Sequence, residues 1–166
     1  MGSWMDSDGL YRQYGVTKAV PTTAGDYLMY GETREIELTI DLTTLTTSPV
    51  IQANTTFFGE DTVLIESVEV FTEVAAVGGT SFSVGLVKLD RTTVISNTAF
   101  LAAVVIADHN VLGERTVYSA GIATAGANVG TVVADPGYIT ALAAGTYSAG
   151  RVKVRIKYRG VPPITQ

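Results

Sequence analysis

Few residues of this chain have the types needed for catalysis. His109 is the only histidine, within Ala107-Asp-His-Asn110, and there is no cysteine. Counting alone therefore excludes zinc–thiolate sites, thiolate nucleophiles and multi-histidine metal sites. A hydrolytic triad needs only one histidine, but no Gly-x-Ser-x-Gly elbow or other nucleophile signature accompanies this one. We expect His109 to be a solvent-facing loop residue, and we expect no enzymatic activity.

Three glutamates, Glu66, Glu69 and Glu73, invite comparison with the paired carboxylates of a glycosidase. On an extended strand, Glu69 and Glu73 share one face and Glu66 lies on the other. This arrangement is more typical of a surface that is solvated or paired with a neighbouring strand. Asp6-Ser-Asp-Gly9 resembles a fragment of a calcium loop, without the remaining ligands. The sequence therefore predicts no metal site and no cofactor.

Two other patterns are weak signs of ligand binding. Gly121, Gly126 and Gly130 lie in a stretch of small residues, but no Lys-Ser/Thr follows and no βαβ unit surrounds them, as a phosphate loop requires. We expect a surface loop there. Trp4 is the only tryptophan, so an aromatic platform for carbohydrate would rest on tyrosines alone.

The clearest structural element is the C-terminal segment Arg151-Val-Lys-Val-Arg-Ile-Lys-Tyr-Arg159. Basic and apolar residues alternate through it, so an extended strand places the basic side chains on one face and the apolar ones on the other. A helix, with its 3.6-residue period, would mix the two sets. We predict a half-buried strand that holds five of the chain's 11 basic residues.

An acidic strand is available as its neighbour. The segment Arg34–Leu42 alternates apolar residues with Glu35, Glu37, Thr39 and Asp41. Opposite charges that face each other across strands contribute about 0.2–1 kcal/mol per pair. We therefore expect the first and last core strands to be antiparallel neighbours. The alternative, a polyanion site on the basic face, is disfavoured by the net charge of −5, and no nucleic-acid partner is expected.

The composition suits one packed domain. The 166 residues are 46% hydrophobic and 16% charged, which argues for a buried core and against disorder. The longest apolar run, 99–107, is far shorter than the roughly 20 residues of a membrane-spanning helix. The acidic stretch 1–9 lacks the apolar run of a signal peptide. We expect neither a membrane partner nor an export signal.

Many short strand-like segments, separated by glycine- and threonine-rich turns, predict an all-β fold. They cover residues 33–42, 62–74, 81–89, 115–118, 131–133, 138–142 and 151–159. Gly78-Gly79 and Asp90-Arg-Thr-Thr93 are turn signals between them. With 17 glycines and no long helix, the pattern is typical of an antiparallel β-sandwich with jelly-roll or Greek-key connections.

One short helix is expected in this β-protein. Asn97 or Thr98 is placed to cap a helix over Ala99–Ala107, and Gly113 lies beyond its end. The Val-Val-Ile run within it also suits a strand, which keeps that alternative open.

The first 32 residues differ from the rest of the chain. They have no regular period and are rich in Tyr, Gly, Thr and Asp, so we predict an irregular arm over 1–32, a β-sandwich core over 33–160 and a tail over 161–166. Tyrosine is enriched at protein interfaces because its body is apolar and its end polar. The arm either reaches over a neighbouring subunit or packs on its own core. In the first case its interface residues are Tyr11, Arg12, Tyr14, Lys18, Tyr27 and Tyr30.

Several of these segments together resemble small virion proteins of tailed bacteriophages. They are Gly9–Lys18, Glu35–Leu45, Glu69–Val87, Asp135–Thr140 and Arg151–Tyr158. The resemblance spans most of residues 9–158. Within that group, the chain looks like a head decoration, or cement, protein.

This resemblance implies a jelly-roll core and assembly as a homotrimer on the capsid exterior. It implies that the partner is the phage major capsid protein, whose neighbouring copies the protein bridges to stabilise the expanded shell. Such a role needs no catalytic residue, cofactor or disulfide. The alternative is a β-sandwich of the tail, neck or fibre, including one that binds surface glycans.

Overall fold

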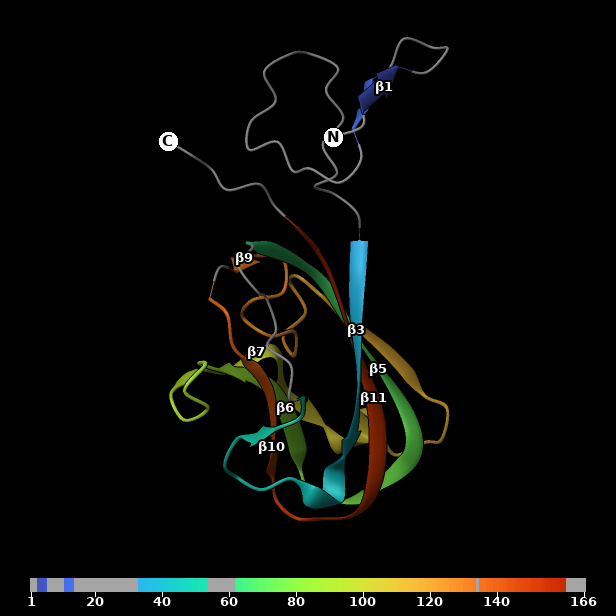
Figure 1. Ribbon diagram of the computed structural model, residues 1–166. Helices are drawn as coiled ribbons and strands as arrows, with labels where there is room; N and C mark the ends of the chain where they lie inside the picture. The colour runs from blue at the N-terminus through green and yellow to red at the C-terminus, as the bar shows by residue number, and fades with distance from the viewer. Residues whose placement is uncertain (1–2, 6–10, 14–32, 54–61, 134, 161–166) are drawn as a thin grey trace.

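The computed structural model describes residues 3–5, 11–13, 33–53, 62–133 and 135–160, and its core consists of two β-sheets (Figure 1). One sheet has the order β3-β11-β5-β8, and a short strand, β9, also pairs with β5. The other has the order β4-β10-β6-β7. The strands are β3 (Thr33–Asp41), β4 (Val50–Ile51), β5 (Val63–Gly78), β6 (Ser81–Val87), β7 (Val94–Val105), β8 (Arg115–Ser119), β9 (Val132–Val133), β10 (Tyr138–Ala144) and β11 (Tyr147–Gly160).

The strand order is that of a jelly roll. Antiparallel pairing joins β3 to β11, β4 to β10, β5 to β8 and β6 to β7. These are the pairings of one long ribbon that doubles back at the β6–β7 turn. Two further pairings, of β11 with β5 and of β10 with β6, roll the ribbon into two sheets. The predicted all-β sandwich is confirmed, and its connections are those of a jelly roll.

The hydrophobic core lies on the inner faces of the sheets, as the alternation of residues in the sequence predicts. In β11, Val152, Val154 and Ile156 are fully buried, and the basic residues between them lie on the outer face. In β3, Leu38 and Ile40 are buried in the same way. Complete burial of one such aliphatic side chain contributes about 1.5–3 kcal/mol.

The first and last core strands are antiparallel neighbours, as predicted, and they lie side by side in Figure 1. Arg151 pairs with Asp41, Arg155 with Glu37, and Lys157 with Glu35. The opposite charges predicted to face each other therefore share one side of this strand pair.

The chain crosses between the sheets at a glycine-rich corner. Gly78, the last residue of β5, pairs with Tyr147 at the start of β11, and β6 begins three residues later. Gly79 has a φ of +67°, and a Cβ atom there would lie 2.5 Å from the Tyr147 ring. The turn predicted at Gly78-Gly79 is confirmed, and glycine is required at position 79 by both backbone and packing.

The helix predicted over Ala99–Ala107 is wrong. Residues Val94–Val105 form strand β7, and only Ile106–Asp108 form a short 3-10 helix, η2. β7 pairs along one edge with β6. Pairing with a neighbouring strand overrides the local signals for a helix cap, and the β-branched Val-Val-Ile run belongs to a strand for most of its length.

The small-residue stretch around Gly126 lies against the other edge of β7. The Gly126 amide donates to the Phe100 carbonyl at 3.0 Å, and the Ala102 amide donates to the Thr124 carbonyl at 2.9 Å. A Cβ atom on Gly126 would lie 2.4 Å from the Ala99 backbone. This glycine therefore allows a loop to cover a strand edge, which would otherwise expose unpaired backbone groups.

The N-terminal arm is not wholly irregular. Two short strands, β1 (Ser3–Met5) and β2 (Tyr11–Gln13), pair antiparallel, which corrects the prediction for those residues. The calcium-loop fragment Asp6–Gly9, most of the arm and the tail 161–166 lie outside the described residues.

Candidate functional site

The two sheets differ sharply in charge. Strands β4, β10, β6 and β7 contain no charged residue, whereas β3, β11, β5 and β8 all carry charged side chains. We call the outer surface of the β3-β11-β5-β8 sheet the charged face. It is the region of the described chain in which polar side chains converge.

Ion pairs run across the charged face from β3 to β5. The basic row of β11 lies between the glutamates of its two neighbours, as its place in the sheet requires. The nitrogen–oxygen distances are 2.9 Å for Arg151–Glu73, 3.1 Å for Lys153–Glu73, 3.6 Å for Lys153–Glu37, 2.7 Å for Arg155–Glu37, 3.6 Å for Arg155–Glu35 and 3.4 Å for Arg159–Glu66. Four of the five bases in this row, Arg151, Lys153, Arg155 and Arg159, are thus paired within the chain, which weakens the polyanion alternative.

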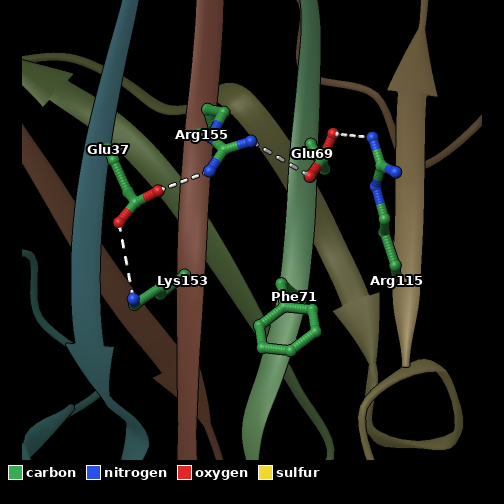
Figure 2. Close-up of a pocket in the computed structure, with 6 residues that line it drawn as sticks. All are labelled: Glu37, Glu69, Phe71, Arg115, Lys153 and Arg155. Atoms are coloured by element: carbon green, nitrogen blue, oxygen red, sulfur yellow. Dashed lines mark hydrogen bonds and ion pairs between the residues drawn. The ribbon is translucent and has the colours of Figure 1, made fainter. Parts of the chain in front are cut away.

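A shallow hollow of about 330 Å³ opens in the charged face, and we call it the Phe71 hollow (Figure 2). Figure 2 shows the Phe71 ring on β5, between Lys153 of β11 and Arg115 of β8. Three cations and two carboxylates contribute to the lining, together with this one aromatic ring. The lining residues are Glu37, Glu69, Phe71, Arg115, Lys153 and Arg155.

Glu69 is the most buried charged side chain of the hollow, with an exposed fraction of 8%. Arg115 Nη2 lies 2.6 Å from its Oε2 atom, and Arg155 Nη1 lies 3.7 Å from its Oε1 atom. The hydrogen bond from Arg115 lowers the pKa of Glu69, although burial acts in the opposite direction. Glu69 is therefore an anion at neutral pH.

Lys153 and Arg155 hold the other carboxylates in the same way. The hydrogen bond from Lys153 lowers the pKa of Glu73, and the bond from Arg155 lowers the pKa of Glu37. The hydrogen bond to Glu73 in turn raises the pKa of Lys153. These shifts move the groups away from titration near neutral pH, so their side chains carry fixed charges there.

The position of Glu66 differs from the prediction. A β-bulge opposite Lys157 and Tyr158 inserts Glu66 as an extra residue of β5. Its carboxylate lies 3.4 Å from Arg159, in the basic row of β11. Glu66 therefore joins Glu69 and Glu73 on the charged face, where each is paired with a base.

Apolar side chains interrupt the charges on the β5–β8 half of this face. Phe71 is 38% exposed, and Val117 and Val74 are also exposed. Phe71 pairs with Arg115, and Val117 pairs with Glu69. We call Phe71, Val117 and Val74 the apolar strip. An apolar centre with a polar rim is the usual anatomy of a protein interface.

His109 is buried, which corrects the prediction that it faces solvent. It is 1% exposed, its ring packs edge-to-face on Phe82 with the centroids 5.2 Å apart, and its carbonyl accepts a hydrogen bond from the Ala76 amide at 2.9 Å. Burial lowers its pKa to about 4. The imidazole is therefore neutral at physiological pH and has a place in the core.

A second hollow, of about 370 Å³, lies beside the β6–β7 turn. Its lining is less charged, with Lys88, Leu89, Asp90, Ile95, Asp135 and Pro136. Asp90 accepts hydrogen bonds from Thr93 and from the Thr92 amide, and the bond with the Thr93 side chain is the main reason that its pKa falls to about 2. The Asp90 carboxylate thus stabilises the predicted turn. Within the described ranges, no group of His, Asp or Glu is placed to hold a metal ion.

Of the six residues predicted for a partner interface, the structure describes two. Tyr11 and Arg12 lie in β2, opposite Met5 and Trp4. The others lie outside the described residues: Tyr14, Lys18, Tyr27 and Tyr30. The Phe71 hollow was not predicted, and the signal for it in the sequence is an aromatic residue at an outward position of a strand, between Glu69 and Glu73.

Comparison with known proteins gives a structural relationship but no family. No family model and no curated protein matches the sequence. One similar solved structure is a chain of the "Cyanophage Pam1 capsid asymmetric unit", with a TM-score of 0.51 and 13% sequence identity. The match covers 89% of this chain and 99% of that one. The two share a fold. Across the part of the sequence that the structure describes, no helix is long and apolar enough to cross a membrane.

Proposed function

We propose that this chain is a structural protein of a tailed-phage virion, and specifically a decoration, or cement, protein of the head. The observation that carries the proposal is the fold shared with a chain of a cyanophage capsid over nearly the whole length of both. Because 89% of this chain corresponds to 99% of the other, the two are of similar size. The likeness therefore extends over nearly all of that chain.

The proposed mechanism is stabilisation by binding. A protein that binds the assembled, expanded shell but not its free subunits stabilises the shell by RT ln(1 + [L]/Kd) per site, about 2.7 kcal/mol at 100-fold excess over Kd. Repeated over many sites, this would oppose the pressure of the packaged DNA. Each molecule would bridge neighbouring major capsid proteins on the outer surface.

Assembly as a homotrimer belongs to the same proposal. Three linked copies would bind three shell sites at once, and the second and third contacts would gain from the high effective concentration. The arm over 1–32 would extend this contact onto a neighbouring subunit through Tyr11, Arg12, Tyr14, Lys18, Tyr27 and Tyr30. The role also requires no catalysis.

Co-sedimentation with tail-less heads tests this function. The purified protein is mixed with expanded heads of the phage that carries it, and the bound copies are counted per particle by quantitative gel analysis. We expect saturation at a number that matches icosahedral positions of the shell, and at a multiple of three. An acidic protein of the same size is the control. Binding to isolated tails or to host cells, without binding to heads, would overturn the head assignment in favour of a tail or fibre protein.

A further inference from the structure

We propose that the Phe71 hollow is the surface through which this protein docks on the phage shell, and that the shell protein presents a carboxylate beside an apolar side chain to it. This inference deepens the proposed function and rests on it. It assigns the contact to one face of the jelly roll and gives the chemistry of the partner.

Arg115 is held ready for a second carboxylate. Its Nη2 atom is fixed 2.6 Å from Glu69, whose side chain is 8% exposed, while the Arg115 side chain itself is 59% exposed. Guanidinium groups bind carboxylates through several N–H donors arranged in a rigid fork. One side of this fork is held by the protein, and the rest is open to solvent. An arginine oriented in this way loses less side-chain entropy when it binds than a free one would.

Phe71 and its neighbours provide the apolar part of the contact. The Phe71 ring lines the hollow, and Val117 and Val74 extend the apolar strip along the sheet. A volume of about 330 Å³ is sufficient for one inserted side chain. Energetically dominant interface residues are often an aromatic side chain and an arginine that are surrounded by a polar rim. The ion pairs of Lys153, Glu73 and Arg151 form such a rim.

The balance of charge selects an acidic partner over a basic one. Three cations and two carboxylates line the hollow, although the chain as a whole has a net charge of −5. The opposite sheet, β4-β10-β6-β7, has no charged residue in its strands and cannot make this distinction. A carboxylate is therefore favoured over a cation in the hollow, and the uncharged strands of the opposite sheet offer no equivalent contact, which also fixes the orientation of docking.

Two substitutions in the Phe71 hollow test the assignment, and two in the second hollow, beside the β6–β7 turn, are the controls. Arg115→Gln and Phe71→Ser remove the anchor groups, whereas Lys88→Gln and Leu89→Ser make equivalent changes beside the β6–β7 turn. Each variant is first compared with wild type by circular dichroism and thermal unfolding. Binding to tail-less heads is then measured by co-sedimentation over a range of protein concentrations at low and high salt.

We expect Arg115→Gln and Phe71→Ser each to weaken binding to heads by at least about tenfold, with little change for the two controls. Raising the salt concentration should weaken the binding of wild type more than that of Arg115→Gln, because only wild type retains the charge contact. If folded Arg115→Gln and Phe71→Ser bind as tightly as wild type, the docking assignment is overturned and the proposed function stands. If wild type itself does not bind heads, both are overturned. Binding of alginate, a carboxylated polysaccharide, in an Arg115-dependent manner without binding to heads would identify a glycan site instead.

Discussion

Arg115 of the edge strand β8 donates a hydrogen bond of 2.6 Å to the carboxylate of Glu69, which is almost entirely buried. The two residues come from adjacent strands that are far apart in the sequence, and Val117, next but one to Arg115, pairs directly with Glu69. A charge-assisted hydrogen bond of this kind is about twice as strong as a neutral one. The Arg115–Glu69 pair therefore holds the edge strand β8 to β5 through side chains, in addition to the backbone pairing of these strands.

Removal of this carboxylate should be more harmful than removal of an exposed one on the same strand. We expect Glu69→Ala to lower the free energy of unfolding by about 1.5–3 kcal/mol, because it removes a charge-assisted hydrogen bond and leaves Arg115 and Arg155 with one partner fewer. Glu66→Ala is the matched control, and its loss should be smaller, since the pair with Arg159 at 3.4 Å is more exposed. Urea denaturation measures both. Equal losses would contradict the special position of Glu69.

The buried His109 should make stability depend on pH above the range in which carboxylates titrate. Its folded-state pKa of about 4 lies below the ordinary value of 6.5, so the unfolded chain takes up a proton first as the pH falls. The stabilisation is complete above pH 6.5 and is lost progressively towards pH 4, by at most about 1.4 kcal/mol per pH unit. We expect His109→Leu to abolish this slope between pH 6.5 and pH 5 in urea denaturation. As His109 is the only histidine, an unchanged slope would show that the imidazole is not the group responsible.

The carboxylates of the charged face should also make the protein less stable as the pH falls, but in a lower pH range than His109 does. Glu37, Glu69 and Glu73 have pKa values below the ordinary 4.5, so the stability that they contribute is present above that pH and is lost as the pH falls through their folded-state values. We expect acid unfolding to shift to higher pH when Arg155 is replaced by Gln, because Glu37 and Glu69 lose a cation. Circular dichroism during acid titration measures the midpoint. A shift in the opposite direction would contradict this network.

The sequence was sufficient for the features that depend on regular alternation. The pairing of β3 with β11 followed from two strands with complementary charges at a period of two, and the register of Arg155 with Glu37 bears it out. Alternation also indicated the all-β class. The jelly-roll order also depends on which distant strands pair with one another. Several pairings are compatible with the same alternation, and no local pattern in a single sequence distinguishes them.

The sequence failed where a local irregularity or a tertiary contact decides the outcome. One bulge in β5 moves Glu66 to the charged face, and a one-residue shift of this kind changes the face of a side chain without changing its local sequence. The helix signals before Ala99 were outweighed by pairing of β7 with β6. His109 is buried because its short segment packs on Phe82, a residue 27 positions earlier in the chain.

A β-bulge in β7, between the pairs Phe82–Val104 and Val84–Leu101, gives a prediction for the β4-β10-β6-β7 sheet. Ala103 of β7 has a φ of +49°, and its amide donates to the Ser83 hydroxyl of β6 at 2.9 Å. We expect Ser83→Ala to lower the free energy of unfolding by about 1–3 kcal/mol, because the amide of a strained residue loses its acceptor. Ser81→Ala, on the same face of the same strand, is the control. Thermal and urea unfolding that do not distinguish the two would argue that the bulge needs no support from Ser83.

Comparison of Gly79, at the corner between the two sheets, with Gly113 separates the effect of backbone strain from that of side-chain packing. Gly79 and Gly113 have similar φ values, +67° and +81°, but a Cβ atom at 79 would lie 2.5 Å from the Tyr147 ring, whereas at 113 it would meet nothing within 4 Å. A positive φ costs an alanine about 1–2 kcal/mol, so Gly113→Ala should be destabilised by that amount. Gly79→Ala should lose clearly more, because the Tyr147 ring is buried and must move at the point where the chain passes from one sheet to the other. Urea denaturation compares the two variants directly, and equal losses would mean that the ring moves aside without cost.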